Sequence, residues 1–407
     1  MVQNNVICVV VDRLHAGMIG AYGNSWIKTA ALDQLAAESF LFDQAFVDSP
    51  QCERLYRAYW LGVHAAGTRQ PPQVGASLPQ LLAAAGVHTA LVTDEAEVAA
   101  MPMSADFAEQ VLVESPAFDQ TVEDVSETGL ARLFGAATAW LESPPEPFCL
   151  WVHARGMAGS WDAPPAMRKQ FADLEDPEPP EFAAVPDHWL AEDYDPDEVL
   201  GIKHAYAGQI STLDLCVGAF CEQLEASGLA ANTLVTFLAA RGFPLGEHRR
   251  VGTCDEALYN ELAQLVWLMR FPDSRGKLAR SQALVQPADL PGTLVEWLGL
   301  DRGKLGRGNA TSLLGIADGR FESLRDRVYM VSRHDRAIRT PAWYLRKPAA
   351  GASELYAKPG DRWEVNEVAR LLGDIVLGLE AALAEIEQTG CADPLAPLAE
   401  PLVSEID

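Results

Sequence analysis

Six consecutive apolar residues, Val6–Val11, stand near the start of the chain and end directly at Asp12. An unbroken, mostly β-branched run of this length is typical of a strand buried on both faces of a parallel sheet. Similar runs are His88–Thr93, Phe148–His153 and Thr233–Leu238. Because segments with helical spacing separate these runs, the sequence predicts an α/β fold with right-handed crossovers, a central mostly parallel sheet and helices on both of its faces.

The segments between these runs predict the helices and divide the chain. Helical spacing is found at Thr29–Ser39, Leu78–Ala85, Val122–Glu142, Tyr206–Ser227, Leu290–Leu298 and Asn366–Thr389. The stretch from about Ala163 to Asp197 is rich in Pro, Asp and Glu, which predicts a surface excursion. After about Arg320, short apolar runs separated by polar turns predict an antiparallel sheet. We therefore expect an α/β domain over residues 1–318, a C-terminal α+β subdomain over residues 319–390 and an acidic tail over residues 391–407.

The balance of charge limits the possible partners. The chain carries 57 acidic and 31 basic residues, which gives a formal net charge of −26. Such a field repels phosphate backbones and anionic membranes, so we expect neither nucleic acid nor a membrane as a partner. No apolar stretch approaches the ~18 residues of a membrane span, and the first strand begins without a basic, cleavable leader. Seven cysteines without a CxxC pair fit reduced thiols. These features predict a cytoplasmic protein.

Seven sequence blocks, in order along most of the chain, carry a family resemblance. They are VVVDRLHAGMIGAYGN, WIKTAALDQLAAESFLFDQAFVDSPQC, SLPQLLAAAGVHTALVT, FCLWVHARGMAGSWDAPP, NTLVTFLAARGFPLGEH, ALVQPADLPGTLVEWLGL and RAIRTPAWYLRKP. This set resembles the sulfatase family of the alkaline phosphatase superfamily. The resemblance implies an alkaline-phosphatase-like fold with a small C-terminal sheet domain. It also implies a chemistry in which carboxylates hold calcium, an oxidised cysteine attacks sulfur, and Lys, Arg and His neutralise the sulfate.

The positions that hold the metal in the family are largely changed in this chain. Asp12 matches the first of two adjacent aspartates, but Arg13 stands in place of the second. After TLVTFL, where the family has Asp-His or Asp-Asn before Gly, Ala240 and Arg241 precede Gly242. A guanidinium removes an oxygen donor and adds a positive charge beside the cation. Two interpretations are open: Asp12 binds a divalent cation, or it forms an internal ion pair with Arg13.

The nucleophile position falls on Cys52. Family members that mature to formylglycine carry Cys-x-Pro-x-Arg, whereas this chain has Arg54 at the Pro position and Tyr56 at the Arg position, with Arg57 one residue late. Because the maturation enzyme reads that short motif, we expect Cys52 to remain a thiol. Two interpretations are open for this thiol, an acidified nucleophile at a helix N-terminus and a half-buried cysteine kept for packing.

Positions that neutralise the ester in the family also carry other residues. Asp94 stands near the position of a family Lys, and Ala96 stands near that of a His. In the block after FCLWVH, Gly156 and Ala158 occupy the places of an acid and an imidazole, and the downstream Lys position falls near Thr253. A sulfate or phosphate ester is an anion, so these exchanges disfavour its binding.

Other charged residues offer a rebuilt site. We expect them on neighbouring loops at the carboxyl ends of the strands, where open α/β sheets bind ligands. They are His15, Asp94, Glu95, Arg54, Arg57 and Arg241. Two interpretations are open: the three arginines form a metal-free anion pocket, or they form salt bridges with Asp12, Asp94 and Glu95.

Three functional hypotheses follow. The first is a sulfatase-like protein that has lost hydrolase activity and serves as a binding or regulatory module, without a cofactor and with a small anionic ligand. The second is a sulfuric or phosphoric ester hydrolase with a remodelled site that uses Cys52, Arg57 and Arg241, and calcium or another divalent cation if Asp12 still binds one. The third is a structural role, with a protein partner or a second copy bound through the C-terminal subdomain or the acidic excursion.

Overall fold

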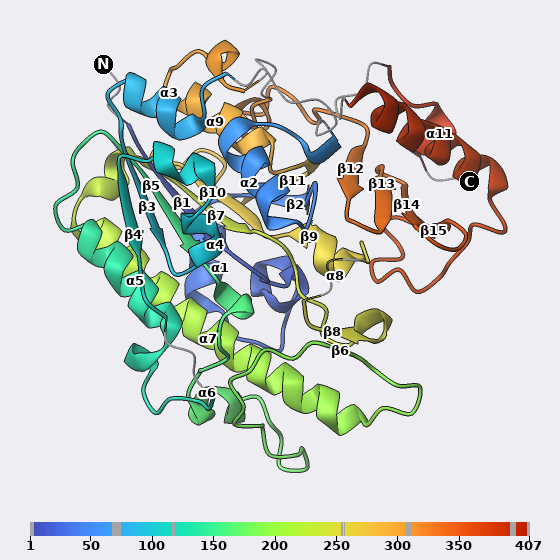
Figure 1. Cartoon of the computed structure of the whole chain (residues 1–407), viewed down its shortest axis with the longest axis horizontal. Helices are drawn as coiled ribbons and strands as arrows, with labels where there is room; N and C mark the ends of the chain where they lie inside the picture. Colours follow the sequence, from blue (N-terminus) through green and yellow to red (C-terminus); the bar gives the residue numbers. More distant parts are fainter. Residues whose placement is uncertain are drawn as a thin grey trace. The chain divides into compact units, whose positions relative to one another are not determined.

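The computed structural model describes residues 4–66, 75–115, 119–253, 255, 257–306, 311–390 and 396–404. The chain divides into two compact units. Figure 1 shows the helices and strands of both, coloured along the sequence. Unit 1 comprises Met1–Leu41, Leu82–Cys254 and Val266–Arg280, and unit 2 comprises Phe42–Leu81, Asp255–Leu265 and Ser281–Asp407. The predicted domain boundaries at residues 318 and 390 stay predictions. Residues 391–395 and 405–407 of the predicted tail lie outside the described residues.

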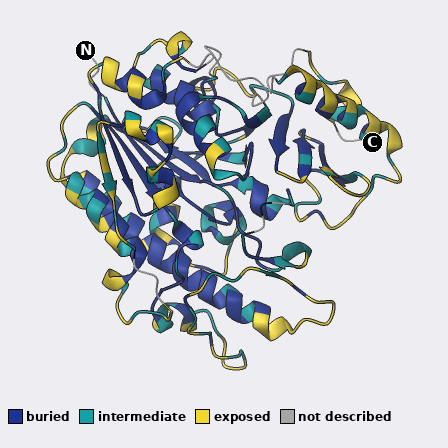
Figure 2. Ribbon diagram, in the orientation of Figure 1, coloured by how far each residue is buried: buried dark blue, intermediate teal, exposed yellow. Residues whose placement is uncertain are grey.

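Unit 1 is built on a mostly parallel sheet. Its strands are β1 (Asn5–Val11), β3 (His88–Thr93), β4 (Glu109–Leu112), β5 (Phe148–Ala154), β7 (Thr233–Ala239) and β10 (Trp267–Arg270). Their order is β10-β7-β1-β5-β3-β4, and all neighbours are parallel except β10, which runs antiparallel to β7. Every residue of β1, β5 and β7 is buried, as their apolar runs predict (Figure 2). The predicted α/β class and the mostly parallel central sheet are confirmed.

Helices flank this sheet. They are α1 (Ala30–Ala37), α4 (Ala96–Ala99), α5 (Gly129–Trp140), α6 (Pro165–Lys169) and α7 (Pro196–Ala226). Helices α1, α5 and α6 pack against α7, while α5 also contacts β3 and β5. The helix predicted at Val122–Glu142 is shorter, because Thr128 caps α5 with its hydroxyl on the Ala131 N–H at 3.2 Å.

Helix α7 is longer than predicted and begins inside the predicted surface excursion. Asp195 caps it by accepting the Asp197 N–H at 3.0 Å, and Pro196 fills the first turn, where its missing N–H is tolerated. The short strand β6 (His188–Trp189) precedes α7 in the sequence and pairs antiparallel with β8 (Arg250–Val251), which follows α7. Among the described helices, none is both long and apolar enough to cross a membrane.

Strand β2 (Phe40–Phe46) belongs to both units. Its first two residues pair with β10 in unit 1, and Ala45 and Phe46 pair with β9 (Gln264–Leu265) in unit 2. Strand β11 (Ala279–Val285) is its other neighbour in the sheet. Helix α3 (Leu78–Ala84) also spans the division between the units. The remaining helices of this part of unit 2 are α2 (Cys52–Leu61), α8 (Asn260–Ala263), α9 (Asp289–Trp297) and α10 (Leu314–Ala317).

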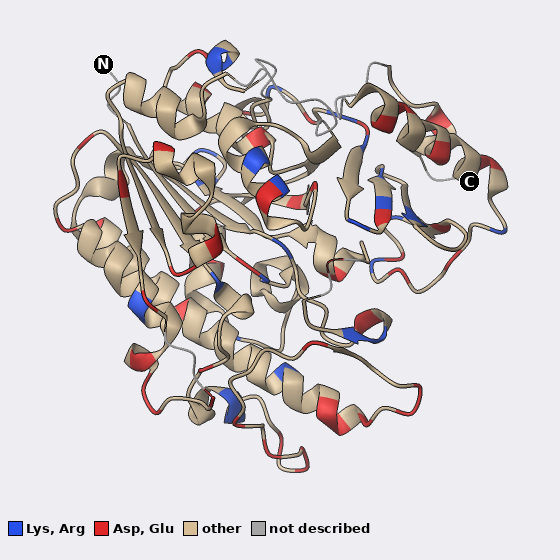
Figure 3. Ribbon diagram, in the orientation of Figure 1, with Lys and Arg blue, Asp and Glu red and all other residues tan. Residues whose placement is uncertain are grey.

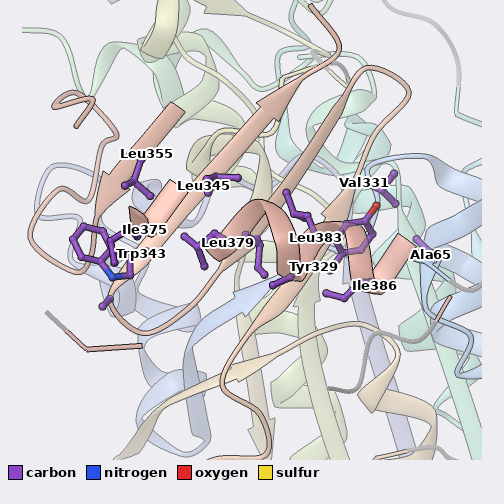
Figure 4. Close-up of a cluster of buried hydrophobic side chains, with 13 residues drawn as sticks. Ala65, Tyr329, Val331, Trp343, Leu345, Leu355, Ile375, Leu379, Leu383 and Ile386 are labelled. Carbon is purple, nitrogen blue, oxygen red and sulfur yellow. The ribbon is translucent and has the colours of Figure 1, made fainter. Parts of the chain in front are cut away.

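The C-terminal part of unit 2 forms the predicted antiparallel sheet. Its four strands, in sequence order, are β12 (Val328–Val331), β13 (Asp335–Arg339), β14 (Trp343–Pro348) and β15 (Glu354–Ala357). Helix α11 (Gly373–Thr389) starts later than the predicted Asn366 and packs on this sheet. Figure 4 shows Leu379, Leu383 and Ile386 of α11 facing Tyr329 and Leu345 of the sheet in one buried cluster. This cluster is the hydrophobic core of the C-terminal part.

Candidate functional site

Charged residues follow four neighbouring strands at the carboxyl edge of the unit 1 sheet. Asp12 follows β1, Asp94 follows β3, Arg155 follows β5 and Arg241 comes two residues after β7. The parallel ladder continues into these loops, since the Asp12 N–H donates to the carbonyl of Ala154 at 2.9 Å. Adjacent parallel strands end at the same edge of a sheet, so side chains from distant parts of the sequence meet there.

Asp12 forms a two-point ion pair with Arg241. Arg241 Nε lies 2.8 Å from Asp12 Oδ1, and Nη2 lies 2.7 Å from Oδ2. The Arg13 N–H also donates to Oδ1 at 2.9 Å. Burial opposes ionisation of Asp12, but the Arg241 and Arg13 charges lower the pKa of its carboxyl to about 2. The carboxylate is therefore fully ionised near neutral pH, and both of its oxygens are engaged by a guanidinium.

His153 lies beside this ion pair at the end of β5. It is buried, and its register partner on β1 is Val10. Burial lowers the pKa of its imidazole to about 4, with further lowering by the charges of Arg241 and Arg155, against an opposing effect of Asp12. The ring is therefore neutral at pH 7 and adds no positive charge to the site.

Asp94 and Glu95 are held by Arg155. The Arg155 N–H donates to Asp94 Oδ1 at 2.8 Å, and Arg155 Nε lies 3.0 Å from Glu95 Oε2. Burial raises the pKa of Asp94 to about 6, although the hydrogen bond from the Arg155 N–H lowers it in part. The interpretation that an arginine pairs with Asp12 holds for Arg241. Glu95 is paired instead with Arg155, which is not one of the three arginines in that interpretation.

A second polar group surrounds Arg13, whose φ of 59° turns the loop after β1. Tyr206 of α7 donates its hydroxyl to the Arg13 carbonyl at 2.7 Å and accepts the His15 N–H at 2.8 Å. His15 Nδ1 accepts the Gly17 N–H at 2.9 Å, which directs Nε2 to Glu247 Oε1 at 3.7 Å. The loop after β1 is therefore fixed by hydrogen bonds to Tyr206 and within the loop itself.

Glu247 is the last residue of this second polar group, which it joins through His15. Burial opposes its ionisation, but the neighbouring His15 imidazole and the Leu245 N–H hold the pKa of its carboxyl at about 2. Sequence reasoning assigned no role to Glu247, Tyr206 or Arg155. The available signals were the LGEH block for Glu247 and the position directly after a buried strand for Arg155. Nothing in the sequence pattern indicates that Tyr206 bonds to the β1 loop.

Gly156 closes the loop after β5 against the loop after β1. Its φ is +55°, and a Cβ placed on it would lie 2.4 Å from the Asp12 carbonyl oxygen. The next residue, Met157, donates its N–H to that same oxygen at 3.0 Å. Glycine is required here both by the backbone conformation and by the close approach. The position that holds an acid in the family therefore has no room for a side chain in this chain.

Cys52 begins helix α2 in unit 2 and is partly exposed. Tyr56, which stands at the family Arg position, is fully buried, with its ring centroid 4.6 Å from that of Trp60. Arg54 and Arg57 lie on the same helix and are partly exposed. These residues belong to unit 2, whereas Asp12, Asp94 and Arg241 belong to unit 1. The convergence of Cys52 and Arg57 with Arg241 on one reacting atom stays a prediction.

The donor set around Asp12 does not fit a divalent cation. Calcium takes six or more oxygen ligands, whereas here Arg241 holds both carboxylate oxygens of Asp12. In the described part of the chain, no group of three or more His, Cys, Asp or Glu side chains is arranged to hold a metal ion. Thr253, at the downstream Lys position, supplies no charge.

Comparisons with known proteins are consistent in fold. A family model described as Sulfatase matches residues 4–300, while no curated protein sequence matches significantly. The phosphonate monoester hydrolase of Agrobacterium radiobacter is 16% identical, with a TM-score of 0.75 over 96% of each chain. A putative sulfatase from Bacteroides thetaiotaomicron is 17% identical, with a TM-score of 0.75 over 95% of this chain and 93% of its own.

A third similar structure contains a ligand. It was determined in complex with its substrate, D-glucosamine-2-N,6-O-disulfate, and is 16% identical to this chain, with a TM-score of 0.77 over 95% of this chain and 98% of its own. At such identities the structures show a shared fold. They show it over nearly the whole chain, including the C-terminal part that the family model does not cover.

Proposed function

Because this chain belongs to the sulfatase family, we propose that it keeps the family fold without metal-dependent ester hydrolysis and acts as a binding or regulatory module. The observation that carries the proposal is the ion pair of Asp12 with Arg241. In this pair the guanidinium stands where a cation would bind, and it supplies the positive charge that the carboxylate needs. A calcium ion would have to displace it and would then face a like charge a few ångströms away.

The charges near Asp94 support the same proposal. An anionic ester is bound by cations that are available to it, and Arg155 is committed to Glu95 at 3.0 Å. Asp94 itself is mostly ionised at neutral pH, since its pKa is about 6. A sulfate group placed next to it would meet a like charge rather than the family's Lys. The neutral imidazole of His153 gives no compensation.

The test is an activity and binding assay on the full chain. Aryl sulfate, phosphate and phosphonate esters are offered with and without added calcium, manganese or zinc, and calcium binding is measured by calorimetry. We expect no turnover above the protein-free rate. We also expect no heat of calcium binding that depends on Asp12, so the titrations of the wild type and of Asp12→Asn should agree. Turnover or calcium binding that disappears in Asp12→Asn, or turnover that disappears in Cys52→Ala, would overturn the proposal. Cys221→Ala, another partly exposed cysteine, is the matched control.

The second candidate is an ester hydrolase with a remodelled site. The comparisons favour this candidate over the first, because the similar structures include a phosphonate monoester hydrolase and a protein bound to its sulfated sugar substrate. It requires Cys52, Arg57, Arg241 and a carboxylate within about 4 Å of one reacting atom. Cys52 would then attack the phosphorus or sulfur atom as a thiolate, the bond to the ester alcohol would break, and the alcohol would leave with a proton from water. The arginines would stabilise the charge that develops on the ester oxygens, and water would then hydrolyse the Cys52 adduct.

A covalent intermediate distinguishes the two candidates. Under the second candidate, the protein quenched during its reaction with an aryl phosphonate ester as substrate should show a mass increase on the peptide that contains Cys52. Cys52→Ala should abolish this mass increase. Arg57→Ala should also lower the rate of ester hydrolysis. Under the first candidate we expect neither an adduct on Cys52 nor hydrolysis above the protein-free rate.

A further inference from the structure

A pocket of about 360 Å³ lies in unit 1, away from the residues described above. One wall is formed by residues 177–188 of the Pro-rich excursion, and the other by residues 197–202 in the first turns of α7. Asp12, Asp94, Arg155 and Arg241 do not line it. Its size lies within the range of small-molecule sites, about 300–1,000 Å³.

The walls of this pocket are held by buried interactions. The guanidinium of Arg168, which is 1% exposed, donates to the carbonyl of Phe182 at 3.0 Å and also to the carbonyls of Trp161 and Pro180. One side chain thus fixes two carbonyls of the Pro-rich excursion, those of Pro180 and Phe182, together with the carbonyl of Trp161 just before it. On the opposite wall Gly201 lets α7 approach Pro180, since a Cβ there would lie 3.3 Å from the proline ring. The pocket is therefore formed before any ligand binds.

The lining combines apolar surface with negative charge. Phe182, Val185 and Ile202 contribute apolar surface, together with prolines 177, 180 and 186. The polar side chains of the lining are Glu178, His188, Asp197 and Glu198. No lysine or arginine is among these described lining residues. Figure 3 shows the acidic residues gathered at the start of α7.

Two of the three carboxylates leave their charge unbalanced. Glu178 is paired with Lys169. In the described part of the chain no lysine or arginine forms an ion pair with Asp197 or Glu198, and Glu198 lies 3.5 Å from the imidazole of His188. The N-terminus of α7 carries a partial positive charge of about one half, which offsets only part of the two full charges on Asp197 and Glu198. The net charge of −26 adds to the negative potential at this surface. An anionic ester is repelled here, so this site does not serve the ligands of the family.

We propose that this pocket binds a small organic cation with an apolar body, such as an aryl-substituted ammonium. The apolar part of the ligand enters between Phe182, Val185 and Ile202. The ammonium stays at the rim, beside the carboxylates of Asp197 and Glu198. The volume favours a small molecule over a peptide, and the two unbalanced carboxylates select a cation over a neutral compound of the same shape.

The experiment titrates the full chain with phenethylammonium, phenethyl alcohol and phenylacetate, using calorimetry and ligand-observed NMR. The three probes share the ring and differ in charge. We expect phenethylammonium to bind at least about fivefold more tightly than the alcohol and phenylacetate to bind least. Raising the salt from about 20 mM to about 500 mM should weaken only the binding of the cation. Equal binding of the cation and the alcohol, or absence of binding by the cation, would overturn the proposal.

Matched variants locate the site. The double variant Asp197→Asn/Glu198→Gln should lose the preference for the cation, whereas Glu192→Gln/Asp193→Asn, which removes two exposed carboxylates outside the lining, should keep it. A preference that is equally lost in both variants would refute the assignment and indicate general charge attraction. Because the first variant also alters the start of α7, Val185→Trp provides a second approach: it fills the apolar part and should weaken the binding of the cation and of the alcohol alike.

Discussion

Replacing Arg241 by alanine should expose the energetic role of its pair with Asp12. Asp12 is 5% exposed, and the guanidinium provides two of the hydrogen bonds to its carboxylate. Removing the guanidinium leaves a buried negative charge without its largest compensation. One-sided removal of a partner from a buried ion pair typically costs about 3–5 kcal/mol of unfolding free energy, and we expect Arg241→Ala to fall in this range at pH 7.

The pKa of Asp12 gives an independent magnitude and a pH dependence. Lowering from the ordinary value of 3.8 to about 2 corresponds to about 2 kcal/mol of stabilisation. Because the folded-state pKa is depressed, this stabilisation is present above about pH 4 and is lost as the pH falls through about 2. The difference in stability between the wild type and Arg241→Ala should therefore be largest at neutral pH and should narrow below about pH 4.

The assay is urea unfolding followed by tryptophan fluorescence, carried out on the wild type, Arg241→Ala, Asp12→Asn and the double variant. The double variant should be more stable than the sum of the two single losses predicts, with a coupling energy above about 1.5 kcal/mol. A change in the slope of the transition would show that the variant alters the compactness of the unfolded or folded state or that unfolding is no longer two-state. If the single losses simply add, or if Arg241→Ala costs less than about 1 kcal/mol, the pair does not hold Asp12 in the way that we describe.

Three further predictions concern other parts of the chain. Burial raises the folded-state pKa of Asp94 to about 6, so the free energy of unfolding of the wild type falls as the pH rises from about 4 to about 6. Over this interval the free energy of unfolding of Asp94→Asn should rise by up to about 3 kcal/mol relative to the wild type, measured by urea unfolding at each pH. Leu379→Ala, in the buried cluster of α11, should cost about 2–5 kcal/mol, whereas Leu377→Ala on the exposed face of the same helix should stay within about 0.5 kcal/mol; equal losses would show that α11 packs differently. Gly156→Ala should cost at least about 1–3 kcal/mol, while the neighbouring Gly159→Ala, with ordinary contacts of 3.4–3.5 Å, should be tolerated in the same thermal unfolding assay.

The sequence was most informative where burial alone determines structure. Strands β1, β5 and β7 are buried on both faces, so their apolar runs were sufficient to predict them. Strand β4 alternates between half-buried and exposed residues, and β11 begins with ARSQ, in which three of the four residues are polar. Such strands carry no continuous apolar run, so neither was predicted. The start of α7 was missed because its first turn has Pro196 and acidic residues, which also mark loops.

The candidate site was predictable only in part, for a geometric reason. Asp12 and Arg241 each follow a strand that the sequence identifies, so an ion pair between an arginine and Asp12 was among the predicted alternatives. The contact of Tyr206 with the loop after β1 depends on how α7 lies beside that loop, which no local pattern specifies. The contact of His15 with Glu247 depends likewise on two loops that are distant in the sequence.

The close approach at Gly156 limits which residues this position can carry. An acidic side chain introduced there would first meet the Asp12 carbonyl oxygen to which Met157 donates its N–H, so a single substitution would strain the loop before it could supply any ligand. A functional side chain at this place would require the loops after β1 and β5 to move together.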